Sequence, residues 1–111
     1  MGRNSRTYSN HTLKAIKLFA AQIRLARKKQ RWSEMELAER AGTSRSTIRQ
    51  IEKGSPATEL GLHFEIASLL GIALFDADDN NLNTLQDKLD LQLALLPKRI
   101  DSESSEVFDD F

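Results

Sequence analysis

Residues 32–54 have the sequence WSEMELAERAGTSRSTIRQIEKG, which predicts two short helices joined by a tight turn. Ser33 and Glu36 have the spacing of a capping box, in which each side chain accepts a hydrogen bond from the other residue's amide. The first helix is expected to end at Ala41. Gly42 follows it, as expected where the backbone must take a positive φ.

The second helix is expected to begin after Ser44, whose hydroxyl can cap it, and to end at Lys53, before Gly54. Ile48 and Ile51 lie on one side of this helix and predict its buried face. Polar and cationic side chains remain on the outer face, where they can contact base edges or phosphates. They are Arg45, Ser46, Arg49 and Gln50.

Three further segments have the features of helices. Apolar residues recur at helical spacing over residues 12–30 and 82–96, and Pro97 ends the second of these. Ser55 and Pro56 suggest a cap and a first helical residue for another helix that runs to Leu70. The sequence thus predicts an all-α fold of four to five helices. Residues 72–75 are a candidate short dimerisation strand.

The charges are divided unevenly between the two halves of the 111-residue chain, although the net charge is zero. Residues 1–56 carry 13 lysines and arginines against 4 glutamates, a net charge of +9. Residues 57–111 carry 3 basic against 12 acidic residues, a net charge of −9. Such asymmetry suggests two different partners, and the basic half suits a polyanion such as nucleic acid.

The composition gives no support to catalysis or to a bound cofactor. The chain has no cysteine, and its two histidines, His11 and His63, lack a spaced set of metal ligands. No glycine-rich phosphate loop follows a predicted strand. We therefore expect neither an enzyme nor a cofactor. No apolar run approaches the roughly 20 residues of a membrane span, and the start lacks a secretory signal, so a cytoplasmic location without a membrane partner is expected.

Residues 32–54 resemble the lambda-repressor/Cro-like helix-turn-helix family, also called the xenobiotic-response-element family. The resemblance extends back to IRLARKKQRWS and forward through SPATELGLHFEIASLLGI, so it covers residues 23–72. It implies a bundle of four or five helices whose second motif helix enters the major groove of DNA. It also implies that Arg45, Ser46 and Gln50 read bases, and that Ser33, Lys53 and the arginines near residue 30 lie near phosphates. The candidate DNA-binding residues are Ser33, Glu34, Ser44, Arg45, Ser46, Thr47, Arg49, Gln50 and Lys53.

Glu34 departs from the pattern of this family, which usually has glutamine at the start of the first motif helix. Phosphate would repel its carboxylate unless a neighbouring cation such as Arg45 pairs with it. Such a pair could orient the arginine for DNA, or it could weaken non-specific binding, and the sequence leaves both alternatives open.

The second half of the chain is similar to HipB-like antitoxins. The similarity lies in ELGLHFEIASLLGIALFDAD, a leucine-rich helix, LALLPKRI and an acidic end in DDF. It implies an antitoxin dimer that binds the operator of its own operon and restrains a HipA-type kinase toxin. In this interpretation Phe108 and Phe111 are candidate partner-binding residues, because a disordered tail with aromatic anchors can fold on a partner. The alternative is a tail that only aids solubility.

These observations predict four segments and one principal function. Residues 1–11 are a flexible basic arm, 12–75 a helix-turn-helix DNA-binding domain, 76–96 a linker and leucine-rich helix, and 97–111 an acidic flexible tail. The leucines of residues 82–96 are candidates for dimerisation or for core contacts within one chain. The predicted function is a dimeric repressor of palindromic double-stranded operator DNA, acting as the antitoxin of a HipA-like kinase. The alternatives are a stand-alone phage-type repressor without a toxin, and a protein-binding module without DNA binding.

Overall fold

The computed structural model of the protein describes residues 6–75 and 79–97. The five helices in these ranges are α1 (Asn10–Lys29), α2 (Glu34–Ala41), α3 (Arg45–Glu52), α4 (Leu60–Leu70) and α5 (Asp79–Ala94). No strand is formed within the described ranges, so the predicted all-α fold is confirmed. Residues 1–5 of the predicted arm, and Phe108 and Phe111 of the predicted tail, lie outside the described residues.

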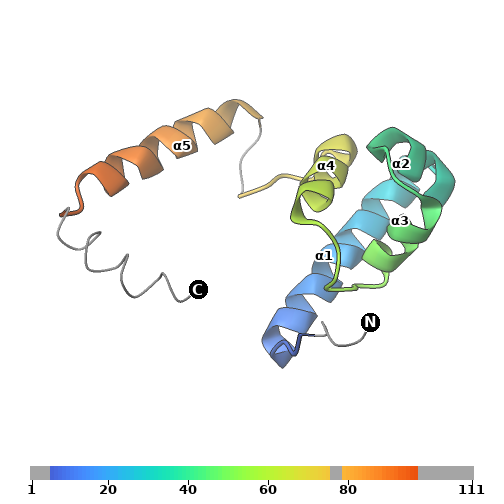
Figure 1. The fold of residues 1–111 in the computed structure, drawn as a ribbon. Helices are drawn as coiled ribbons and strands as arrows, with labels where there is room; N and C mark the ends of the chain where they lie inside the picture. The colour runs from blue at the N-terminus through green and yellow to red at the C-terminus, as the bar shows by residue number, and fades with distance from the viewer. Residues whose placement is uncertain (1–5, 76–78, 98–111) are drawn as a thin grey trace. The chain divides into compact units, whose positions relative to one another are not determined.

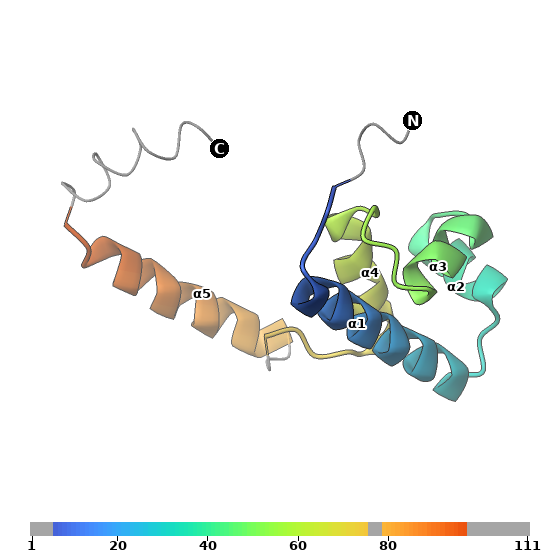
Figure 2. The same cartoon turned by 90° about the horizontal axis from the view of Figure 1, so that it is seen from below.

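The chain divides into two compact units, Met1–Leu74 and Phe75–Phe111. In the first unit α2 packs on α3, and both α1 and α2 contact α4 (Figure 1). The view from below also places α3 beside α1, with which it makes contacts (Figure 2). The short helices α2 and α3 are therefore supported by the two longer helices rather than by each other alone.

Apolar residues from all four helices form the core of the first unit. In α3 the burial of Ile48 and Ile51 confirms the predicted buried face, whereas in α2 the buried Leu37 was not predicted. Ala38 is fully buried, which lets α2 and α3 approach closely because an alanine side chain takes little space. The buried cluster consists of Ile23, Leu37, Ala38, Ile48, Ile51, Ile66 and Leu70.

All four helices of this unit end in the same hydrogen-bonded turn, in which a residue with positive φ and the residue after it each donate their amide to one of the last carbonyls of the helix. Gly42, Gly54 and Gly71 take φ values of 73°, 84° and 73° at the ends of α2, α3 and α4. At the end of α1, Arg31 takes this role with φ 63°, and the Trp32 amide donates to the Arg27 carbonyl. For a residue with a Cβ, this conformation costs about 1–2 kcal/mol.

The start of α4 differs from the prediction that Ser55 caps it and Pro56 opens it. The helix begins at Leu60, and Glu59 precedes it without a side-chain capping bond. Ser55 instead belongs to the turn that ends α3, where its amide donates to the Gln50 carbonyl at 3.0 Å. The Ser55 hydroxyl then accepts from the nearby Ala57 amide at 3.3 Å, within the loop.

Residues 72–75, the candidate dimerisation strand, form no strand in this single chain. The Ile72 amide donates to the Ala67 carbonyl and so belongs to the end of α4. Phe75 takes φ 56°, which is outside the extended region. Pairing of this segment between two copies stays a prediction.

Helix α5 begins three residues before the predicted start, and most of its leucines are exposed within this chain. Leu89, Leu93 and Leu96 are 47%, 63% and 49% exposed, on the face that the leucine spacing predicts. Leu91 and Leu95, the latter just after the end of α5, are exposed as well. Leu91 is two residues from both Leu89 and Leu93, which places it on a different face of the helix. Within the described ranges, no helix combines the length and apolar character needed to cross a membrane.

A buried ion pair joins α1 to α3. Arg27 donates from Nε and Nη2 to the two carboxylate oxygens of Glu52, at 2.6 and 2.9 Å. Its third nitrogen donates to the Trp32 carbonyl at 2.9 Å, and Arg24 donates to the Glu52 backbone carbonyl at 2.7 Å. Arg27 and Glu52 are only 8% and 5% exposed, so both charges depend on each other for compensation.

Replacing Arg27 with alanine is expected to lower the free energy of unfolding by roughly 3 kcal/mol, because it leaves the Glu52 carboxylate buried without its partner. Urea unfolding followed by circular dichroism measures this loss. Lys28→Ala is the matched control, since it removes an exposed cation one residue away on the same helix. The double variant Arg27→Met with Glu52→Leu should be more stable than Arg27→Ala. Equal stability of the Arg27→Ala and Lys28→Ala proteins would contradict this account.

Candidate nucleic-acid interface

Helix α3 presents its polar side to solvent because its apolar side is buried in the core. The Ser44 hydroxyl accepts from the Thr47 amide at 3.1 Å, which confirms the predicted cap. Ile48 and Ile51 are 0% and 2% exposed, and they fix the rotation of the helix about its axis. Six of the candidate DNA-binding residues are consequently exposed around α3. They are Ser44, Arg45, Ser46, Arg49, Gln50 and Lys53.

Thr47, another candidate, is half-buried and engaged in the cap of α3. Its hydroxyl lies 2.9 Å from the Ser44 hydroxyl, and either oxygen can donate to the other. This contact fixes the first turn of α3, from which Arg45 and Ser46 project. A structural role of Thr47 in the cap therefore stands beside the predicted DNA contact.

The start of α2 forms the capping box that the sequence predicts. The Ser33 hydroxyl accepts from the Glu36 amide at 3.0 Å, and the Ser33 amide donates to the Glu36 carboxylate at 2.8 Å. Both partners are exposed. This helix start therefore carries negative charge and satisfies two of its own amides, although the resemblance implies that it faces a phosphate.

Glu34, the first residue of α2, lies beside two arginines of α3. One oxygen, Oε1, is 3.3 Å from the Nε of Arg45 and 3.8 Å from the Nε of Arg49. The Arg45 contact is a hydrogen bond. The structure thus places three predicted site residues together and forms the pair that the sequence raised for Glu34 and Arg45.

Not all cations near the end of α1 face solvent. The position of Arg27 among these cations suggests a phosphate contact, and its burial excludes that role. Its hydrogen bond to Glu52, together with the charge of that carboxylate, raises the pKa of Arg27 despite burial, so the guanidinium stays charged across the physiological pH range. A signal for this burial is present in the sequence, since Arg27 continues the helical spacing of Ile16, Ala20 and Ile23.

Comparison with known families agrees with this geometry. Residues 23–76 match the helix-turn-helix family. The matched segment contains α2, the turn at Gly42 and α3, together with the end of α1 and all of α4. Such a match indicates a DNA-binding transcription regulator. No curated protein and no solved structure matches the chain.

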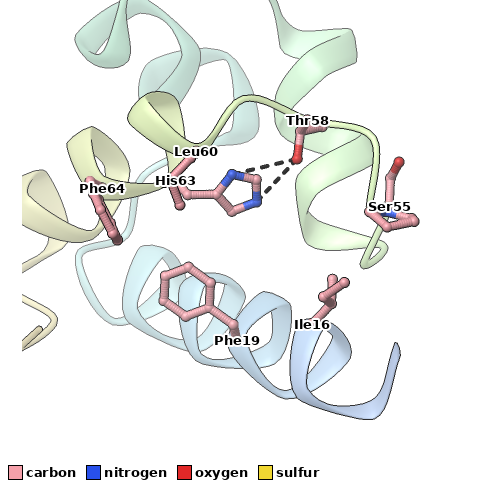
Figure 3. Close-up of a pocket in the computed structure, with 8 residues that line it drawn as sticks. Ile16, Phe19, Ser55, Thr58, Leu60, His63 and Phe64 are labelled. Carbon is pink, nitrogen blue, oxygen red and sulfur yellow. Dashed lines mark hydrogen bonds between the residues drawn. The ribbon is translucent and has the colours of Figure 1, made fainter. Parts of the chain in front are cut away.

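The helix-turn-helix domain also contains an apolar pocket of about 240 Å³ between α1, α4 and the loop that follows α3 (Figure 3). Phe19 of α1 faces His63 of α4, and Ile16 of α1 and Phe64 of α4 also line the pocket. The His63 ring stacks on Phe19 with ring centres 5.9 Å apart, and its nitrogens lie within hydrogen-bonding distance of the Thr58 hydroxyl and the Glu59 carbonyl. His63 is thus a packing residue, and no cluster of metal-ligating side chains occurs among the described residues.

Gly54 allows the end of α3 to approach α1 closely. A Cβ at this position would lie 2.9 Å from Lys17 Cγ and 3.4 Å from Lys17 Cα. Gly42, in the turn of the motif, has a similar positive φ, but a Cβ there would have no neighbouring atom within 4 Å. Both positions would impose backbone strain on a residue with a Cβ, but only position 54 would add a steric contact.

Gly54→Ala is expected to cost more stability than Gly42→Ala. Both substitutions force an alanine into positive φ, at a cost of about 1–2 kcal/mol. Only the Gly54 variant must also move Lys17 away from the end of α3. Thermal unfolding of the two variants measures the difference, and equal melting temperatures would show that the contact with Lys17 carries no cost.

Proposed function

We propose that the protein is a dimeric, sequence-specific transcriptional repressor that inserts α3 into the major groove of a palindromic operator. The observation that carries this proposal is the exposed row of Arg45, Ser46, Arg49 and Gln50 on a helix whose other side is fixed by the core. Arginine can bind guanine through O6 and N7, and glutamine can bind adenine through N6 and N7. Lys53, exposed at the end of α3, is suited to a phosphate contact.

Dimerisation is part of the proposal because one helix-turn-helix domain reads a single half-site. Two domains must be held so that their recognition helices lie one helical turn of DNA apart, roughly 34–36 Å. The exposed leucines of α5 supply an apolar surface outside the DNA-binding unit. The face with Leu89, Leu93 and Leu96 is the one we assign to pairing with a second copy.

We further infer that the repressor is the antitoxin of a HipA-type kinase toxin and controls its own operon. The similarity of the second half of the chain to HipB-like antitoxins supports this. Leu91 of α5 and Leu95 just after it are further exposed leucines, which self-pairing through the first face would leave uncovered. The net charge of −9 on residues 57–111 favours a protein partner over DNA for this half.

The DNA-binding role can be tested by comparing two substitutions at the outer side of α3. Arg45→Ala should reduce the affinity for a site selected by the wild-type chain from random DNA by roughly 10- to 100-fold per half-site, with little effect on random DNA. Lys53→Ala should weaken binding to both DNAs and lower the salt slope by about 0.9 for each phosphate that the variant no longer neutralises. Fluorescence anisotropy at several salt concentrations measures both. Equal reductions on both DNAs for Arg45→Ala would exclude it from base reading.

The antitoxin role can be tested by affinity purification from cells that naturally carry the protein. A kinase of the HipA type should be recovered with the full chain and identified by mass spectrometry. Phe108→Ser with Phe111→Ser should reduce recovery if the tail binds the kinase, whereas Ser104→Ala with Ser105→Ala should not. Recovery of DNA and the protein's own dimer alone would instead favour the stand-alone repressor.

A further inference from the structure

We infer that Glu34 is a specificity-determining positioning residue: its carboxylate holds Arg45 in the conformation that reads DNA and lowers the affinity for DNA in general. This inference rests on the proposed DNA-binding function. It concerns a residue of α2, outside the recognition helix, that acts through a residue of α3. The sequence leaves open whether Glu34 orients Arg45 or weakens non-specific binding. In this inference the same contact does both.

The contact is shared between two arginines. Arg45 and Arg49 are four residues apart on α3, so their side chains are neighbours on one helix face and their charges repel. Glu34 Oε1 approaches the Nε of both, at 3.3 and 3.8 Å. A single carboxylate oxygen from α2 therefore lies beside the Nε atoms of both arginines and partly compensates both positive charges.

The atoms involved leave the DNA-binding end of Arg45 available. A guanidinium group has five N–H donors, of which one is on Nε and four are on the two terminal nitrogens. Glu34 accepts from Nε, so the terminal pair remains for the O6 and N7 acceptors of guanine. The side chain of Arg45 is 54% exposed, and that of Glu34 only 27%, so the arginine is the more accessible of the two to DNA.

Holding Arg45 in advance favours correct base pairs. A long exposed side chain loses rotamer freedom when it binds, and a side chain that is already positioned loses less. Arg45 then gains most where a guanine matches its position, and little elsewhere. Without Glu34, the same arginine can move to any nearby phosphate, which adds affinity without sequence preference.

Glu34 also opposes binding that depends on phosphates alone. Non-specific affinity comes from the number of phosphates that lysine and arginine neutralise. The single negative charge of Glu34 offsets one of the two positive charges of Arg45 and Arg49. Glu36 adds a carboxylate at the same helix start, but its hydrogen bonds go to Ser33 in the capping box and not to an arginine.

Glu36 therefore provides a matched control for the experiment. Glu34→Gln and Glu36→Gln each remove one negative charge from the first turn of α2. Glutamine can also keep the capping box at position 36. Only the substitution at position 34 alters the contact with Arg45. The full chain is used throughout, with two DNA probes: a site selected by the wild-type chain from a random pool, and random duplex DNA of the same length.

We expect Glu34→Gln to raise affinity for random DNA and to lower the ratio of selected-site to random affinity by roughly tenfold. Glu36→Gln should raise both affinities by similar factors and leave the ratio unchanged. In an Arg45→Ala background, Glu34→Gln should no longer change the ratio. In the free protein, the NMR signal of the Arg45 Nε–H group should shift in Glu34→Gln but not in Glu36→Gln, which tests the contact independently of DNA.

The outcomes separate this inference from the function on which it rests. If the wild-type chain selects no sequence, the proposed function fails. If it selects one, but Glu34→Gln and Glu36→Gln give the same ratio, the function stands and the role of Glu34 is excluded. A fall in the ratio for Glu34→Gln that persists in the Arg45→Ala background would show that the carboxylate does not act through this arginine, and would also overturn the inference.

Discussion

The buried pair of Arg27 and Glu52 is the interaction on which the arrangement of the helix-turn-helix domain depends. Three guanidinium nitrogens of Arg27 are used, two for the Glu52 carboxylate and one for the Trp32 carbonyl. The pair thus joins α1, the loop before α2 and the last turn of α3. Burial of two charges gains little net stability compared with apolar packing, but each charge is costly without the other. An arrangement of α1 and α3 that separated the two charges would leave each of them buried without its partner.

Because the buried face of α3 is fixed in the core, the orientation of its exposed face is fixed as well. Ile48 and Ile51 set the rotation of the helix, Glu52 ties its last turn to α1, and the close approach of Gly54 to Lys17 sets its distance from that helix. The two glutamates that contact arginines therefore have different roles. Glu52 lies in the core and ties α3 to α1, whereas Glu34 contacts its arginine partners at the surface, where both arginines remain exposed to solvent.

The sequence predicted the features that depend on residues close together in the chain. The Ser33 and Ser44 caps and the turn at Gly42 are local, and all three are confirmed. The start of α4 was predicted wrongly because Ser55 has two competing uses, and the terminating turn of α3 takes its amide first. The end of α1 has no glycine signal, since Arg31 takes the positive φ there.

Contacts between distant residues were not predictable in the same way. Arg27 lies 25 residues from Glu52, and only the fold brings them together, although the helical spacing already placed Arg27 on the buried face of α1. The pair of Glu34 and Arg45 was foreseen because the motif fixes the geometry of α2 against α3. The exposed leucines beyond Leu74 have no such local explanation, because nothing within the single chain buries them. Under the proposed function they pair two copies, so contacts within one chain would position the helix that reads a half-site, and contacts between chains would set the spacing of two half-sites.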